Sequence, residues 1–600
     1  MISQKVLMRK IAWAVPVLLF LAACPVFCQD ASPSTVQPEA SQAPAPAPAA
    51  SVPAAAAPQS APAPAPSATT FNDVLDHMVQ REHYFLAQMR HMHPMVETYL
   101  QDLKNDAGGN AVPVGDKYFL GRLDMSDGPE DTSFVGQPGF GHRLLNKLTG
   151  VYALHFLPLG FAQMVILDSD FQKKYYNFTF VRREFLGEVR CLVIDVQPKE
   201  GQKTARFMGR IWVEDQDYNI VRFNGTYYPP PKVSLFFHFD SWRLNMRPGT
   251  WLPAYIYTEE SNVKTGLTKT LHFKAQTRLW GYDLKALSKN EEFTQIVVDS
   301  PQSVKDQSDS ASDPNPIIAQ RMWEKQAEEN AVERLQKIGL LAPPGEVDKI
   351  LCTVVNNLLV TNNIDLQGDV GCRVFLTAPL ESFTIGHTIV MSRGLVDVLP
   401  DEASLAMVLS HELAHIVLGH RLDTTLAFND KMLFPDENSF QKLDFKRNST
   451  DEEAADTKAL ELLNNSPYKD KLATAGLFLK ALQEKGPDLP NLIRPHLGNS
   501  LAAGKSIRMS TLLTSAPALD AKKLDQIAAL PLGGRIRLDP WTDQVELVKT
   551  KPVALTSARE KMEFEIAPFF PYLTRISTGG EKVALTTSST PSTTAAPEQK

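Results

Sequence analysis

The sequence predicts an α+β protein in which an antiparallel, β-rich region precedes a mostly helical region. Three observations support this division. Between about residues 117 and 285, segments rich in aromatic and β-branched residues follow one another, as in strands joined by turns. A polar segment then ends this pattern at residues 300–316. The sequence beyond it has mainly helical patterns, with only two short strands, expected at 373–376 and 388–391.

The N-terminus resembles a secretory signal peptide. A basic start is followed by the apolar stretch 11–23, which is too short to span a bilayer comfortably. Two processing sites compete: residues 21–24, Leu-Ala-Ala-Cys, resemble a bacterial lipobox in which Cys24 is lipidated, and cleavage after Cys28 is the alternative. We therefore expect export across the inner membrane, to the periplasm or the outer membrane. A lipid on Cys24 is the only membrane attachment that we expect.

Composition divides the remaining chain. The 600 residues leave room for more than one domain. A net charge of −7 without any basic run excludes a nucleic-acid partner. Segments rich in Ala, Pro and Ser, or in Ser, Thr and Pro, cannot bury a core. The expected order is a signal peptide (1–28), an Ala/Pro-rich linker (29–70), a β-rich domain (71–295), a linker (296–316), a helical domain (317–515), a C-terminal extension (516–576) and a disordered tail (577–600).

The β-rich domain opens with a predicted helix over residues 71–105. Val74, Met78, Phe85 and Met89 are spaced for one helical face. Strands are then expected at 175–181, 191–196, 207–213 and 220–228. This succession of hairpins, with Phe185-Leu186-Gly187 and Arg210-Ile211-Trp212-Val213, resembles the curved half-barrel of LolA-like lipoprotein-handling domains. Any other antiparallel sheet domain is the alternative.

Three cysteines lie in the body of the chain. Secretion would permit disulfides, and Cys352 with Cys372 is the expected pair. Cys191 then remains as a buried thiol.

Residues 401–420, DEASLAMVLSHELAHIVLGH, predict a buried helix with a metal site. His411 and His415 are four residues apart, which places both imidazoles on one helical face, where they can hold one Zn²⁺. Glu412 stands beside the first ligand and is placed to take a proton from the attacking water. A buried helix with two packed histidines is the alternative, but burial of these polar groups without partners is costly.

A third protein ligand is expected on a second helix. His420 is nine residues after His411, half a turn out of phase, and is not expected to be a ligand. Glu452 and Asp456 are four apart downstream, so that Glu452 can bind zinc while Asp456 accepts the second ring N–H of a ligating histidine. A capping box, Ser449 with Glu452 or Thr450 with Glu453, is the alternative interpretation.

Taken together, His-Glu-Leu-Ala-His at 411–415 and Glu-x-x-Ala-Asp at 452–456 resemble the BepA/HtpX group of gluzincin zinc peptidases. The resemblance covers about 317–515 and includes Ser392-Arg393-Gly394-Leu395 before the zinc helix. The absence of internal transmembrane patterns favours the soluble BepA-like branch. Where the family usually has Asn-Ala-Phe, beside bound substrate, this chain has Glu381-Ser382-Phe383-Thr384.

The resemblance implies a zinc-dependent metalloendopeptidase, with one Zn²⁺ per chain, that cleaves extended or misfolded polypeptides outside the cytoplasm. An envelope quality-control role fits BepA, with envelope assembly machinery or an apolar ligand of the β-rich domain as further partners. A chaperone or lipoprotein-binding protein with a silent or structural zinc site is the second hypothesis.

His496 is a candidate fourth ligand. In BepA-like peptidases, a histidine in a His-Pro segment beyond the Glu helix can occupy the water position. Here the order is Pro495-His496, in a turn with Gly498. Ligation by His496 would make the enzyme latent, whereas a loop histidine without a role is the alternative.

Overall fold

The computed structural model describes ten stretches of the chain, with single gaps at 169, 367 and 567 and short gaps at 266–268 and 504–505: 70–105, 111–125, 130–135, 164–229, 237–284, 316–420, 444–516, 536–539, 544–547 and 566–576. The predicted signal peptide with Cys24, nearly all of both linkers and the predicted tail lie outside these residues. None of the helices within the described stretches is long and apolar enough to cross a membrane.

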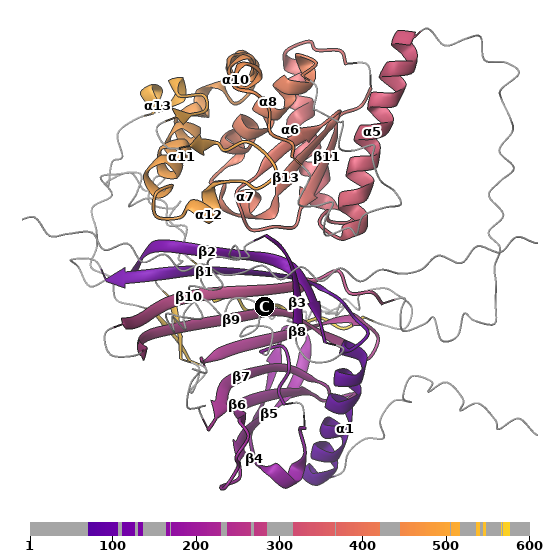
Figure 1. Cartoon of the computed structure of the whole chain (residues 1–600), viewed down its shortest axis with the longest axis vertical. Helices are drawn as coiled ribbons and strands as arrows, with labels where there is room; N and C mark the ends of the chain where they lie inside the picture. Colours follow the sequence, from indigo (N-terminus) through magenta and orange to yellow (C-terminus); the bar gives the residue numbers. More distant parts are fainter. Residues whose placement is uncertain are drawn as a thin grey trace, which may run out of the picture. The chain divides into compact units, whose positions relative to one another are not determined.

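Ten antiparallel strands form one sheet, in the order β3-β2-β1-β10-β9-β8-β7-β6-β5-β4 (Figure 1). Strands β4 to β10 each pair with the next, and β1 pairs with β10 at Met95–Trp280. The strands are β1 (Met95–Asn105), β2 (Ala111–Asp124), β3 (Glu130–Val135), β4 (Tyr176–Leu186), β5 (Val189–Pro198), β6 (Arg206–Glu214), β7 (Ile220–Tyr228), β8 (Phe239–Arg247), β9 (Thr250–Thr265) and β10 (Lys269–Trp280). With the helical region that follows, this sheet confirms the predicted α+β class.

The predicted helix over 71–105 is wrong beyond residue 89. Helix α1 spans Phe71–Met89 and begins at Thr70, whose side chain accepts the N–H of Asp73 in a capping box. The chain then turns, and residues 95–105 form β1 instead. Pro94 explains the change, because a proline disfavours helical backbone in the residue before it.

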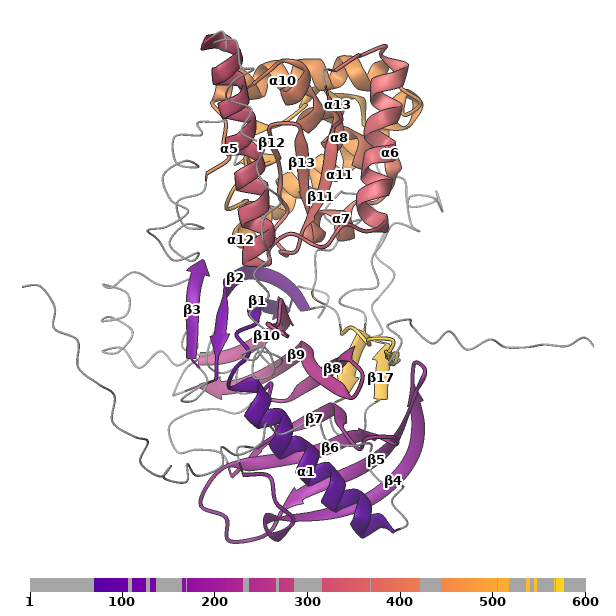
Figure 2. The same cartoon turned by 90° about the vertical axis from the view of Figure 1, so that its right-hand side faces the viewer.

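Strand alternation gives the large sheet two buried faces. Ile194, Phe223 and Phe239 pack on one face, in a cluster that includes the apolar side of α1. Figure 2 shows α1 running obliquely over the strands. Residues such as Cys191, Trp212 and Trp242 belong to the cluster on the opposite face.

An extended C-terminal segment, residues 566–576, covers part of this second face; we call it the strap. Ile566 and Leu573 of the strap are buried, and Phe570 lies edge-on to Trp242. Arg575 donates to the fully buried carboxylate of Glu214 at 2.7 Å. The strap is therefore part of the sheet's packing, although it is hundreds of residues away in sequence.

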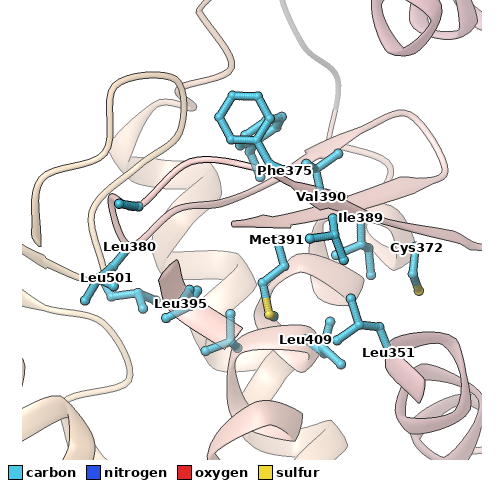
Figure 3. Packing of buried hydrophobic residues seen from close by; sticks show 14 of the residues in the cluster. Leu351, Cys372, Phe375, Leu380, Ile389, Val390, Met391, Leu395, Leu409 and Leu501 are labelled. Atoms are coloured by element: carbon cyan, nitrogen blue, oxygen red, sulfur yellow. The ribbon is translucent and has the colours of Figure 1, made fainter. Parts of the chain in front are cut away.

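The helical region surrounds a three-stranded sheet in the order β11-β13-β12, with β11 parallel and β12 antiparallel to β13. The expected strands at 373–376 and 388–391 appear here as β11 (Gly371–Phe375) and β13 (Thr388–Ser392), and β12 (Ser382–Ile385) forms the edge. Figure 3 shows Leu351 and Leu409 packed against Ile389 and Met391. The helices are α5 (Pro316–Ile338), α6 (Glu346–Thr361), α7 (Arg393–Val398), α8 (Glu402–Val417), α10 (Ser449–Asn464), α11 (Leu472–Lys485), α12 (Pro490–Ile493) and α13 (Thr511–Ser515).

Four short strands and two 3-10 helices complete the described elements. They are β14 (Ala502–Ala503), β15 (Ser506–Ile507), β16 (Ile536–Asp539), β17 (Gln544–Leu547), η2 (Lys173–Tyr175) and η5 (Lys469–Lys471).

The expected disulfide between Cys352 and Cys372 is not formed. Both thiols are free, and Cys352, on α6, directs its Sγ to the carbonyl oxygen of Val370 at 3.7 Å. Cys191 is the buried free thiol that was expected, and burial raises its pKa to about 12.

Candidate metal centre

Helix α8 presents the two predicted histidines to one point. The helix begins at Asp401, whose carboxylate accepts the N–H of Ser404 at 2.8 Å, and its apolar residues are buried nearly all round. His411 and His415 are each 2% exposed, and their Nε2 atoms are 3.1 Å apart. Burial lowers the pKa of His415 to about 3, so this ring is neutral, which is the form that binds metals.

Helix α10 brings the predicted third ligand to the same point. Glu452 Oε2 lies 3.3 Å from His411 Nε2, and Oε1 lies 3.4 Å from His415 Nε2. The helix is capped by Asn448, which accepts the N–H of Asp451 at 2.8 Å, and not by either predicted capping box. Glu452 is therefore not used as a cap.

The spacing of these three ligand atoms fits zinc. Ligands at about 2.0–2.1 Å from a tetrahedral centre are about 3.3–3.4 Å from one another. The two Nε2 atoms are 3.1 Å apart, and each lies 3.3–3.4 Å from a different oxygen of Glu452, so the three side chains approach this spacing. Two imidazoles and a carboxylate are also a common zinc donor set in hydrolases. The guanidinium of Arg508 contacts both His411 Nε2 and Glu452 in this structure.

A polar atom lies close to the other ring nitrogen of each histidine, although His411 Nδ1 and Asp456 Oδ1 are not aligned for a hydrogen bond. Asp456 Oδ1 lies 2.9 Å from His411 Nδ1, where the sequence predicts such an acceptor. His415 Nδ1 lies 2.9 Å from Nδ1 of His420. His420 can therefore orient the ring of His415. The sequence did not indicate this role, because on a straight helix His420 would be half a turn out of phase with His411.

Glu412 lines the same small cavity, whose volume is about 10 Å³. Its carboxylate accepts hydrogen bonds from Ser382 and Thr384 of β12, both at 2.7 Å. Burial acts to raise the pKa of Glu412, but the fields of His411 and His415, with these two hydroxyls, outweigh it and lower the pKa. Ser382 and Thr384 belong to residues 381–384, where this chain lacks the Asn-Ala-Phe that is usual in the BepA/HtpX group. This segment therefore contacts Glu412, the expected proton acceptor.

Several further residues close the cavity, and the sequence did not indicate them. Asn499 donates to Glu452 at 2.5 Å, and Arg447 donates to the carbonyl oxygen of Thr384 at 3.3 Å. Phe445 stacks on Phe383 at 4.8 Å. A volume of about 10 Å³ holds a single water or ion, so a peptide can enter only if some of these side chains move.

His496 lies elsewhere in this structure. Its ring stacks on Tyr118 at 5.2 Å, and its backbone N–H is bound by the carboxylate of Glu381. Burial lowers the pKa of His496 to about 4. His496 is not among the residues that line the cavity, so its predicted role as a fourth ligand would need a different arrangement of this turn.

Known proteins match the two parts of the chain differently. Residues 375–435, which include His411, Glu412 and His415, match the model of peptidase family M48. Among curated proteins, no significant match was found. Two solved structures align at 11% identity and a TM-score of 0.17: a DUF1329 family protein from Desulfovibrio piger (35% of this chain, 91% of that chain) and the LolA superfamily protein NE2245 from Nitrosomonas europaea (36% and 93%).

These two structural alignments have TM-scores too low to support an argument about function. The match over 375–435 includes β12, β13 and α8, and therefore His411, Glu412 and His415, whereas Glu452 on α10 lies beyond the matched residues. Together with the ligand set and the α8 motif, this match supports a metallopeptidase of the M48 type in the helical region.

Proposed function

We propose that this chain is a zinc-dependent metalloendopeptidase that cleaves extended or misfolded polypeptides outside the cytoplasm. The main support is the convergence of His411, His415 and Glu452 at separations that fit tetrahedral zinc, with Glu412 in the same cavity. A structural zinc site would use four protein ligands, whereas catalysis needs one position left for water. The described residues that could hold a metal ion form a set of three.

The residues divide the work as follows. When bound, zinc polarises the scissile carbonyl and makes water a better nucleophile. His411, His415 and Glu452 would hold it. Glu412 accepts a proton from the attacking water and then passes it to the leaving amine. The lowered pKa of Glu412 keeps this carboxylate ionised, as an acceptor must be.

An extended substrate is supported by the position of β12. It is an edge strand of its sheet and lies next to the cavity, so an extended peptide can be added alongside it as a further strand once the turn at Gly498, which lies against Ser382, moves away. Arg447 holds the carbonyl oxygen of Thr384 in this structure and would have to release it.

Export is supported by the N-terminal sequence, with its basic start, short apolar stretch and lipobox-like Cys24. A role in envelope protein quality control, in the manner of the BepA-like branch, is the biological setting that we propose. Envelope assembly machinery, and an apolar ligand for the β-rich domain, are the partners that this setting suggests.

The test is cleavage of casein together with zinc stoichiometry by elemental analysis. Glu412→Gln should retain zinc and lose proteolysis, because only the proton acceptor is removed. His411→Ala and Glu452→Ala should lose zinc as well. Glu453→Gln, which changes an exposed carboxylate beside Glu452, is the matched control. Equal cleavage of casein by wild type and Glu412→Gln would reject the mechanism. If both bind casein and neither cleaves it, the result would support the second hypothesis, a chaperone or lipoprotein-binding protein with a silent or structural zinc site.

A further inference from the structure

Both oxygens of the Glu412 carboxylate are held by hydroxyl groups of one strand. Ser382 Oγ donates to Oε1 and Thr384 Oγ1 donates to Oε2, each at 2.7 Å. The Thr384 hydroxyl also lies 3.2 Å from the main-chain oxygen of Glu412. The two bonds therefore tie the side chain of Glu412 to β12 at both ends of its carboxylate.

The alternation of β12 explains why two hydroxyls meet one carboxylate. Residues two apart on a strand point to the same face. Ser382 and Thr384 therefore both face α8, while Phe383 between them packs with Phe375 and Phe445 on the other side. Ser382 and Thr384 are 4% and 1% exposed, so both hydroxyls are shielded from solvent.

The strand that bears the two hydroxyls is itself fixed. Ser382 pairs with Met391, and Thr384 pairs with Ile389, both on β13. On the other side, Gly498 approaches so closely that a Cβ there would lie 2.6 Å from the carbonyl oxygen of Ser382. Donors on such a rigid element hold their acceptor in one orientation without reorganising during the reaction.

These bonds have opposite effects on catalysis. A hydrogen bond to a carboxylate weakens it as a base, because the donor stabilises the charged form. It also restricts the side chain to one rotamer, and a misplacement of about 1 Å can cost about a hundredfold in rate. Each carboxylate oxygen has two lone pairs, so a proton from water can still be accepted.

We propose that Ser382 and Thr384 are positioning residues for Glu412, which fix its carboxylate toward the metal centre so that it can accept a proton. This proposal rests on the proposed function. It assigns a role in the reaction to the segment in which this chain departs from the pattern of its family.

The experiment compares Ser382→Ala, Thr384→Val and the double variant with wild type in the full chain. The measurements are kcat and KM on quenched fluorogenic casein, zinc stoichiometry and thermal unfolding. Each single variant should lower kcat about tenfold, which corresponds to ~1.4 kcal/mol at 25 °C, with KM and zinc content unchanged. Thr384→Ser, which keeps the hydroxyl, should restore kcat. Ser410→Ala removes a buried hydroxyl of α8 that donates to the carbonyl oxygen of Met407, and is the matched control.

A crystal structure of the double variant adds a readout that does not depend on activity. The Glu412 carboxylate should then occupy more than one rotamer. An unchanged or higher kcat in the double variant would overturn the proposal, and so would a loss of zinc in both single variants, since the hydroxyls would then support the metal centre itself. If wild type does not cleave casein more than Glu412→Gln does, the proposed peptidase function is wrong. If wild type cleaves casein and the double variant cleaves it equally well, only the positioning role of Ser382 and Thr384 is wrong.

Discussion

Asp456→Ala should weaken zinc binding without changing the three ligands. Asp456 Oδ1 lies 2.9 Å from His411 Nδ1, and its other oxygen accepts the N–H of Met509 at 3.0 Å. When Nε2 of His411 faces the metal, its ring proton is on Nδ1 and needs an acceptor. Removal of the carboxylate takes away the acceptor that lies 2.9 Å from His411 Nδ1 and leaves the ring freer to rotate.

The magnitude follows from the environment of the contact. A well-aligned hydrogen bond to a charged group contributes about 1.5–3 kcal/mol. His411 Nδ1 and Asp456 Oδ1 are close but not aligned for one, which reduces the contribution. The side chain of Asp456 is 23% exposed, so water can replace part of what the carboxylate provides. Removal of a residue that orients a metal ligand usually lowers metal affinity by about 10–100-fold. We expect a loss near the lower end of that range, about tenfold in zinc affinity or ~1.4 kcal/mol. His420→Ala removes a neutral acceptor from His415, and about fivefold, ~1 kcal/mol, is expected.

Competition with a chromophoric chelator measures these affinities directly. Asp456→Asn keeps an acceptor and loses the charge, so it should fall between wild type and Asp456→Ala. Glu453→Ala, on the exposed side of the same helix, should bind zinc like wild type. If Asp456→Ala binds zinc as tightly as the control, the carboxylate does not orient His411 and the reasoning is refuted.

Three further predictions concern stability and regulation. Burial raises the pKa of Glu381 to about 7 from an ordinary value of 4.5, although the N–H groups of His496 and Leu497 act to lower it. The folded chain thus holds this proton more tightly than the unfolded chain does. The free energy of unfolding should therefore fall by about 3 kcal/mol as pH rises from 4.5 through 7. Glu381→Gln should abolish this dependence on pH, measured by urea unfolding. Arg575→Ala should cost about 3 kcal/mol in the same assay, because it leaves the buried Glu214 carboxylate without its cation. For His496→Ala, the latent-enzyme hypothesis predicts altered casein cleavage with zinc retained, whereas an effect on thermal stability alone would show that the ring only packs.

Local spacing explains what the sequence predicts well at the site. His411 and His415 are one helical turn apart, and so are Glu452 and Asp456, so each pair shares a face wherever its helix packs. His420 was different, because the helix does not continue straight. Gly419 has a φ of +67°, which turns the chain back after α8 and brings His420 beside His415.

Contacts between distant segments could not be predicted in this way. Ser382 and Thr384 meet a residue 30 and 28 positions away, and a strand of four residues is too short for its pattern to reveal which face is buried. In the large sheet, the residue composition predicts the strands at 191–196 and 207–213. It does not predict the pairing of β1 with β10, because these segments are about 180 residues apart and their register depends on all the strands between them.

The strap has a consequence for the order in which the molecule is made. Its contacts with the sheet join residues 331 to 465 positions apart: Ile566 with Gln101, Arg575 with Glu214 and Ile576 with Asn245. During synthesis the sheet emerges first, but the segment that covers Trp242 and neutralises Glu214 appears only after the whole helical region. The newly made chain must therefore carry an uncovered aromatic face, which is prone to association with other chains, until the strap has been synthesised.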